Sequence, residues 1–235
     1  MAGAFVQAAS AEGLAASSVT TAAITTTTGN QVYIGTNTTG TDATTPITDS
    51  YSNTWVQVGH SAASSYAYVE LWYCANLTGG SGHTFTYTTT GSDYDTIAVM
   101  EFSGMATSSP LDVGGNTYFA GPTNGSSLTT PSLTTLNAAD VLIAVGGDDG
   151  SAVGTRSFNS PFTTPSGAVQ SSNAGQPVAM GYYIISATGA HTATYNPGGI
   201  NRSSAGIAAF KQGATAAPAF YPFKKYLQFP AWEEE

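Results

Sequence analysis

Short apolar runs that alternate with polar residues recur along the chain, and clusters of Gly, Asn, Asp and Pro separate them. This pattern predicts β-strands, because successive side chains of a strand point to opposite faces of a sheet. The strands predicted in this way are residues 4–9, 19–26, 31–36, 54–61, 66–75, 83–89, 95–103, 116–121, 127–133, 141–147, 178–186, 191–196 and 205–211. No window keeps a helical period beyond one turn, and residues 11–18 are the best helical candidate.

The turns and the strand patterns indicate how these strands are arranged. Residues 49–53 (DSYSN) predict an Asx-type turn and residues 147–150 (GDDG) a compact acidic turn, so neighbouring strands pair antiparallel. Residues 95–103 and 141–147 are almost continuously apolar, which is typical of strands covered on both faces, whereas residues 83–89 alternate like a half-exposed strand. The sequence therefore predicts an all-β fold, an antiparallel two-sheet β-sandwich.

The composition changes at residues 213–219 (GATAAPA), a linker of small residues. We therefore predict one β-sandwich domain over residues 1–213 and an extended C-terminal tail over residues 214–235, which is rich in aromatic residues and proline. The tail residues expected to contact a partner are Phe220, Tyr221, Phe223, Lys224, Lys225, Tyr226, Phe229 and Trp232.

Burial of the aromatic rings in this tail would gain about as much free energy as ordering its backbone costs. The tail thus gains little by folding on itself, while its prolines lower the cost of docking into an apolar groove on another surface. We interpret it as a docking arm. The alternative is a strap that lies across its own sandwich.

The charge of the chain limits its partners. Charged residues make up only 8% of the sequence, the formal net charge is −9, and Lys and Arg together number 5. Nucleic-acid sites need clustered basic side chains, so we expect no nucleic-acid partner. Solubility must then come from uncharged Thr, Ser, Asn and Gly.

The N-terminal residues 1–18 contain neither a basic region nor a sustained apolar run, so we expect no signal peptide and no membrane span. Cys74 is the single cysteine, and its place in a predicted strand indicates a buried, inert thiol. An extracellular type of composition without an export signal suits a virion protein made in the host cytoplasm and released by lysis. A separately exported protein, or a fragment of a longer precursor, would suit it too.

A search for chemistry gives no dedicated catalytic, metal or cofactor site. His60, His83 and His191 are widely separated, and we expect each at the surface or at a strand edge. The sequence contains no GxSxG motif. Asp148 and Asp149 are expected to form a plain acidic turn, because the spacing of a dedicated Ca²⁺ loop is missing.

Other polar and aromatic residues lie inside predicted strands. Glu70 and Glu101 are expected at an edge or interface that faces water or a neighbouring subunit, because a buried carboxylate is costly. The aromatic candidates are Trp55, Tyr66, Tyr68 and Trp72. Period-2 alternation places the last three on one face, which would suit a glycan platform, but the inner face of a sandwich or a subunit contact would look the same.

Five segments follow one another in a characteristic order: TDSYSNTWVQVG, YVELWYCANLTGGSGHTFTYTTT, TIAVMEFSGMATSSPLD, SLTTPSLTTLNAADVLIAVG, and YYIISATGAHTATYNPGG with IAAFK. Together they resemble a β-sandwich module of phage structural proteins and of bacterial surface or extracellular proteins. The resemblance covers nearly all of residues 4–211. It implies a jelly-roll or immunoglobulin-like sandwich used for display or attachment, and it brings no catalytic residues.

These observations predict a non-enzymatic virion structural protein, a phage capsid decoration or a fibre or appendage component. We expect it to form a homo-oligomer, to bind other virion or surface-assembly proteins through its arm, and to need no cofactor and no metal. The alternative function is a carbohydrate-binding or adhesin module. A hydrolase has the least support from the sequence.

Overall fold

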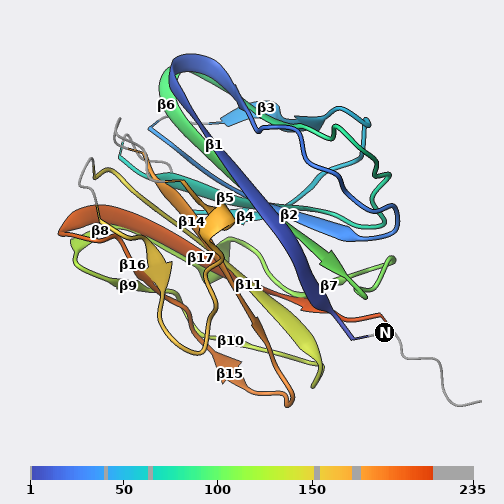
Figure 1. Ribbon diagram of the computed structural model, residues 1–235. Helices are drawn as coiled ribbons and strands as arrows, with labels where there is room; N and C mark the ends of the chain where they lie inside the picture. The colour runs from blue at the N-terminus through green and yellow to red at the C-terminus, as the bar shows by residue number, and fades with distance from the viewer. Residues whose placement is uncertain (1, 40–41, 63–65, 151–153, 171–175, 214–235) are drawn as a thin grey trace, which may run out of the picture.

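The computed structural model describes residues 2–39, 42–62, 66–150, 154–170 and 176–213. The described chain is all-β, and its sheets are antiparallel. The first six-stranded sheet has the order β1-β6-β2-β5-β4, with β3 paired to β6 (Figure 1). Its strands are β1 (Ala4–Thr20), β2 (Gln31–Thr38), β3 (Asp42–Asp49), β4 (Val56–His60), β5 (Tyr68–Cys74) and β6 (Phe85–Ser103).

The second six-stranded sheet has the order β13-β14-β11-β17-β7, with β8 paired to β17. Its strands are β7 (Leu111–Val113), β8 (Phe119–Gly125), β11 (Asp140–Asp148), β13 (Val169–Gln170), β14 (Val178–Ile184) and β17 (Asn201–Lys211). Two small sheets pair β10 (Leu133–Thr134) with β15 (Ala190–His191), and β12 (Ser157–Phe158) with β16 (Thr194–Asn196) and β9 (Leu128–Thr129). Two 3₁₀ turns, η1 (Asn116–Tyr118) and η2 (Ser166–Ala168), precede β8 and β13.

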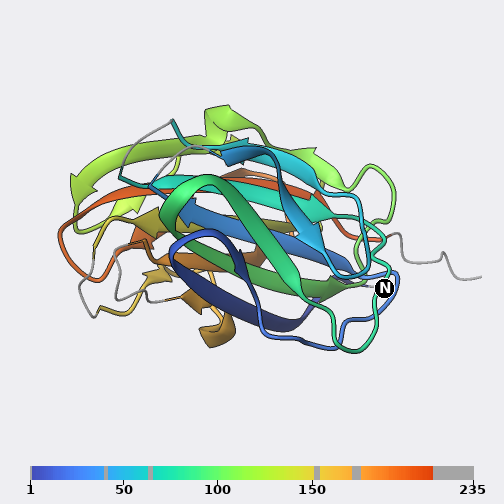
Figure 2. The same ribbon diagram turned by 90° about the horizontal axis from the view of Figure 1, so that it is seen from above.

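One hydrophobic core lies between the two large sheets. The first sheet contributes Tyr33, Leu71 and Phe102, and the second contributes Ile143 and Phe210, all fully buried. The shared core gives the sheets a sandwich-like arrangement, as predicted. In Figure 2 the strands β5, β2, β6 and β1 follow one another across the molecule.

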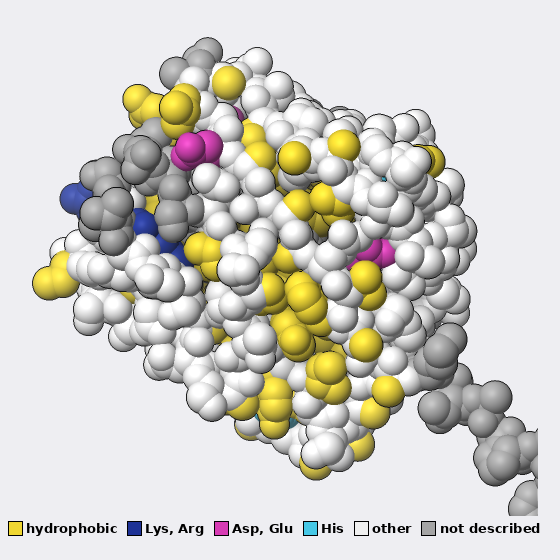
Figure 3. All heavy atoms as spheres, viewed as in Figure 1, with side chains coloured by type: hydrophobic (Ala, Val, Ile, Leu, Met, Phe, Trp, Pro, Cys, Tyr) yellow, Lys and Arg dark blue, Asp and Glu magenta, His cyan; other side chains and the backbone are white. Residues whose placement is uncertain are grey.

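Each large sheet is also covered on its outer face. Ile34 and Val99 of the first sheet belong to a second core cluster with Tyr87, while Leu142 of the second sheet belongs to a third cluster with Tyr195. Consequently β11 is buried at every residue and residues 95–102 of β6 are buried too, which confirms the prediction that the two apolar segments are covered on both faces. Apolar side chains cross one face of the molecule as a band, and few charged groups appear there (Figure 3).

Local element boundaries differ from the predicted ones, and the strand predicted at residues 19–26 ends at Thr20 as part of β1. Residues 11–18, the best helical candidate, lie within β1, where Ala11–Gly13 pair with residues 95–97 of β6. Tertiary pairing therefore overrides the helix propensity of this Ala-rich stretch. Residues 85–89 of the predicted strand 83–89, and the whole predicted strand 95–103, belong to the single strand β6. β1 and β6 run side by side and bend together (Figure 1).

The first and last described segments meet. The N–H group of Gly3 donates to Oε1 of Gln212 at 2.7 Å, and Gly213 N donates to Gly104 O at 2.7 Å. Residues 214–235, the predicted arm, lie outside the described residues. Within the described part of the chain, no helix is long and apolar enough to cross a membrane.

Candidate functional site

The four aromatic candidates do not share one environment. Tyr68 and Trp72 on β5 are buried, at 4% and 9% exposure. Trp55 is half-buried and packs against the outer core cluster of the first sheet, which includes Trp72, and its indole N–H donates to Asp49 Oδ2 at 2.7 Å. Tyr66 is 41% exposed. The structure therefore places the two tryptophans at one core cluster of the first sheet, and Tyr66 belongs to none of the core clusters.

Tyr66 lies beneath the guanidinium of Arg202, whose Cζ is 3.7 Å from the ring centroid. Arg202 comes from β17, and it also forms an ion pair with Asp149 at 3.6 Å. A cation over an aromatic face at an exposed position stabilises by about 0.5–1 kcal/mol. The eight arm candidates, from Phe220 to Trp232, lie outside the described residues, and their role stays a prediction.

The carboxylate of Asp148, the last residue of β11, accepts hydrogen bonds from several directions. Its Oδ1 accepts hydrogen bonds from Gly150 N (2.8 Å), Asn201 Nδ2 (3.1 Å) and Arg156 Nη2 (3.2 Å). Its Oδ2 accepts from Tyr195 OH (2.7 Å) and Arg156 Nε (3.3 Å). Asp148 and Arg156 are both fully buried, so their ion pair lies in the interior.

Electrostatics within this cluster follow from burial. Desolvation raises the pKa of Asp148, and the hydrogen bonds and charge of Arg156, with the hydroxyl of Tyr195, act in the opposite direction. The pKa of Tyr195 is raised well above its usual value, because of burial first and of the Asp148 carboxylate second. Tyr195 is therefore a neutral donor at physiological pH.

The expectation of a plain acidic turn at residues 147–150 is wrong for Asp148. Gly147 and Asp148 belong to β11, and the strand carries the carboxylate into the interior. Asp149 behaves as expected of a turn residue, since its Oδ1 caps the N–H group of Arg202 at 2.8 Å. Both oxygens of Asp148 already accept hydrogen bonds, which leaves little coordination capacity for Ca²⁺.

Arg156 is not among the residues that the sequence pattern predicts as functional. It occupies the interior because two loop carbonyls, Gly150 O at 2.7 Å and Gly154 O at 3.0 Å, accept the remaining guanidinium hydrogens. One signal was available: an Asp at the end of an apolar strand needs a counter-charge, and the chain has only 5 basic residues from which to supply it.

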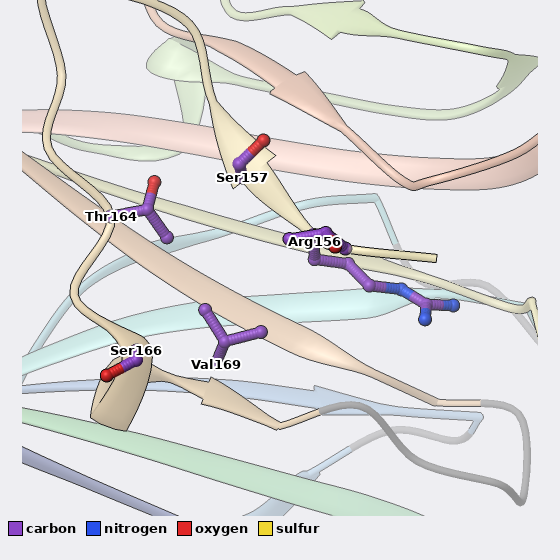
Figure 4. Close-up of a pocket in the computed structure, with 6 residues that line it drawn as sticks. Arg156, Ser157, Thr164, Ser166 and Val169 are labelled. Atoms are coloured by element: carbon purple, nitrogen blue, oxygen red, sulfur yellow. The ribbon is translucent and has the colours of Figure 1, made fainter. Parts of the chain in front are cut away.

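A depression of about 370 Å³ adjoins this cluster (Figure 4). The side chains around it are Thr155, Arg156, Ser157, Thr164, Ser166 and Val169. The guanidinium of Arg156 is turned away from the other labelled side chains and toward Asp148, while Thr164 Oγ1 accepts the N–H of Phe158 at 2.9 Å. The depression thus offers hydroxyl groups and a valine, with no free cation or general base among its lining residues.

Comparison with known protein families, curated proteins and solved structures finds no match for this chain.

The carboxylates of Glu70 and Glu101 are buried, at 0% and 1% exposure, so the expectation that they face water or a neighbour is wrong. Glu101 accepts hydrogen bonds from Thr27 N (2.8 Å), Asn30 Nδ2 (2.7 Å) and Gln7 Nε2 (2.6 Å). These donors satisfy a carboxylate that would otherwise be costly to bury. The same physical reason holds for Glu70.

Glu70 lies on β5 between neighbours from two strands. It accepts from Gln57 Nε2 at 2.6 Å and from Thr36 Oγ1 at 3.2 Å. Gln57 belongs to β4 and Thr36 to β2, which flank β5 in the sheet. The carboxylate therefore ties three adjacent strands together.

His83 also differs from its prediction, because it is fully buried. Its Nδ1 lies 2.7 Å from Thr26 Oγ1, and its Nε2 lies 3.1 Å from Asp49 Oδ1. A hydroxyl, an imidazole and a carboxylate in a row could activate a nucleophile. However, Thr26 is 4% exposed, and Gly80 N approaches its Oγ1 at 3.4 Å, so a substrate has no access to the hydroxyl.

Asp49 anchors this row through the turn predicted from the sequence. Its Oδ1 accepts the N–H of Tyr51 at 2.8 Å, which confirms the Asx-type turn at residues 49–53. Cys74 is buried as predicted, and burial with the nearby Asp49 charge raises the pKa of its thiol to about 11. Among the described residues, no group of three or more His, Cys, Asp or Glu side chains is placed to hold a metal ion.

Proposed function

We propose that this protein is a non-enzymatic structural component of a virus particle, a phage capsid decoration or a fibre component, and that it attaches through its C-terminal arm. The observation that carries the proposal is the anchoring of β17, the strand that leads into the arm. It forms a continuous ladder with β11 from Asp140 opposite Lys211 to Asp148 opposite Ser203. On its other side it pairs with β7 and β8.

The end of β17 is held from several directions. Lys211 N donates to Pro110 O at 2.8 Å, and Ala106 N donates to Lys211 O at 3.0 Å. Residues 203–210 of this strand are buried. A load applied through the arm therefore reaches a central strand of the sandwich rather than an edge or a loop, which is what an attachment protein requires.

The buried carboxylates support a structural role. Those of Asp148, Glu101 and Glu70 each accept several internal hydrogen bonds, so their acceptor capacity is used within the fold. Catalytic carboxylates need contact with a substrate in a cleft. None of these three side chains is exposed.

We extend the proposal to the sandwich type, which we assign to the jelly-roll or immunoglobulin-like group. The order of the first sheet supports it, because β1 lies beside β6 and β2 lies between β6 and β5. Neighbouring strands that are distant in the chain are typical of Greek-key sandwiches. We also propose that the protein forms a homo-oligomer.

Removal of residues 214–235 tests the arm. We expect the shortened chain to lose self-association in analytical ultracentrifugation while its melting temperature stays within about 2 °C of the full chain, since a docking arm adds little to an isolated domain. A second variant, the full-length chain with Phe223 and Trp232 replaced by Ser, should lose self-association as well, which would assign the effect to the aromatic side chains of the arm. A large drop in melting temperature, with association unchanged, would identify the tail as a strap across its own sandwich.

The virion assignment has its own test. Mass spectrometry of particles purified on a density gradient from the source culture should detect this chain in the particle band. Its presence only in the particle-free fractions would refute the assignment while leaving the arm experiment meaningful.

A further inference from the structure

Asp140, the first residue of β11, is a buried carboxyl group in an unusual environment. Its exposure is 0%, and in ionised form neither of its oxygens has a hydrogen-bond donor among the described residues. The backbone of Asp140 is held firmly, because its carbonyl accepts the N–H of Ile185 at 3.0 Å. An ionised carboxylate buried without donors is strongly disfavoured.

Asp112 on β7 supplies the neighbour that explains this environment. Its Oδ2 accepts the N–H of Leu136 at 2.8 Å, and its Oδ1 accepts from Asn137 Nδ2 at 2.6 Å. Both donors lie in the turn that leads into Asp140, and the hydrogen-bonding and charge influence of Asp112 both raise the pKa of Asp140. Two ionised carboxylates have no hydrogen to share, but a single proton between them supplies the donor.

The other groups that act on Asp140 come from two further strands. Lys211 of β17 is its direct cross-strand partner, and this ammonium lowers the pKa of Asp140. Tyr33 of β2 is fully buried, and the Asp140 charge contributes to the rise of its pKa. Burial and Asp112 outweigh Lys211 and raise the pKa of Asp140 to about 7.

We propose that Asp112 and Asp140 form a proton-dependent latch that joins β7 to the start of β11, closed when the pair holds one proton and open when both groups are ionised. The latch lies where β17 ends, because Lys211 faces Asp140 across the ladder and pairs through its N–H with Pro110, next to β7. The base of the arm is therefore held more firmly at mildly acidic than at alkaline pH. This inference does not depend on the virion assignment.

The direction of the pH effect follows from linkage. A carboxyl group whose pKa is higher in the folded than in the unfolded protein binds more protons when folded, so stability falls as the pH rises between the two values. The relevant window extends from the ordinary aspartate value of 3.8 up to about 7. Above that window the Asp140 contribution is constant.

Two measurements on the full chain test the latch. In ¹³C NMR, we expect one carboxyl resonance, absent in Asp140→Asn, to titrate near pH 7, and we expect Asp112→Asn to shift that midpoint to lower pH. In thermal unfolding between about pH 4.5 and 8, wild type should lose stability relative to Asp140→Asn. Glu12→Gln, which removes an exposed carboxylate, should keep the wild-type profile.

Three outcomes would overturn the proposal. The first is a wild-type spectrum in which no carboxyl resonance titrates near pH 7, a result that needs no assignment and holds even if Asp140→Asn does not fold. The second is an unfolding profile of Asp140→Asn that parallels wild type over the whole pH range. The third is stabilisation of wild type by CaCl₂ at about pH 8 that EDTA reverses and Asp140→Asn abolishes, which would make the pair a cation site instead.

Discussion

Replacement of Arg156 by methionine removes the cation of the buried Asp148 cluster while keeping much of the side-chain volume. Four hydrogen bonds at 2.7–3.3 Å disappear, two of them to Asp148 and one each to Gly150 O and Gly154 O. The carboxylate left behind is fully buried. Breaking a buried ion pair by removing one partner costs about 3–5 kcal/mol, because the remaining charge has no compensation.

For a chain of 235 residues this loss is large enough to measure easily. At about 2–4 °C per kcal/mol, Arg156→Met should lower the melting temperature by about 6–20 °C. Arg202→Met is the matched control, because Arg202 is 47% exposed and its ion pair with Asp149 is at the surface. Loss of that pair and of its contact with the Tyr66 ring should cost no more than about 1–2 kcal/mol.

The pH dependence gives the Arg156→Met experiment a second readout. Burial already raises the pKa of Asp148, and loss of Arg156 removes the strongest opposing influence. A protonated Asp148 tolerates burial, so the deficit of Arg156→Met relative to wild type should be smaller at about pH 4.5 than at about pH 8. Equal effects of the two arginine substitutions, or a deficit that does not change with pH, would refute the buried ion pair.

Two further predictions concern buried groups of the first sheet. His83→Leu should lower the free energy of unfolding in urea by about 2–4 kcal/mol, because it leaves two buried hydrogen-bond partners, Thr26 and Asp49, without the imidazole. His60→Leu, at a partly exposed position, should cost less than about 1 kcal/mol. Similar losses for both variants would contradict the stabilising role of the His83 hydrogen bonds. The thiol of Cys74 should resist alkylation at about pH 8 in the folded protein and react promptly in denaturant, because only the accessible thiolate is nucleophilic. Mass spectrometry measures the extent of alkylation, and rapid alkylation of the folded chain would show that the thiol is accessible.

Local sequence patterns predicted those parts of the fold that depend on local physics. The almost continuously apolar segments became the strands β11 and the second half of β6, both buried, and the DSYSN turn formed around the carboxylate of Asp49. Alternation could not foresee that residues 85–103 form one strand, because the stretch around Gly91 is polar and interrupts the apolar pattern. It becomes a strand only through pairing with β1 and β3.

The polar clusters form between segments that are distant in the chain, so the local sequence pattern could not predict them. Arg156 reaches Asp148 across a loop, and Asn201 joins them from a strand more than 40 residues further along the chain. His83 is buried because segments around Thr26 and Asp49 close over it from both sides. Residue type and spacing do not predict which side chains come together in the folded chain. The small number of basic residues that could neutralise a buried carboxylate does narrow the candidates.

The buried carboxylates also bear on how this sequence selects one arrangement of strands. The chain is rich in Thr, Ser, Ala and Gly, whose similar sizes make a shift of register inexpensive in packing terms. A shift by one residue would, however, carry Glu70 or Asp148 to the opposite face and separate it from donors on neighbouring strands. An unpaired buried carboxylate costs far more than a mismatched methyl group. We therefore infer that Glu70 and Asp148 help to fix the register of their strands, because each accepts hydrogen bonds from other segments in the observed pairing.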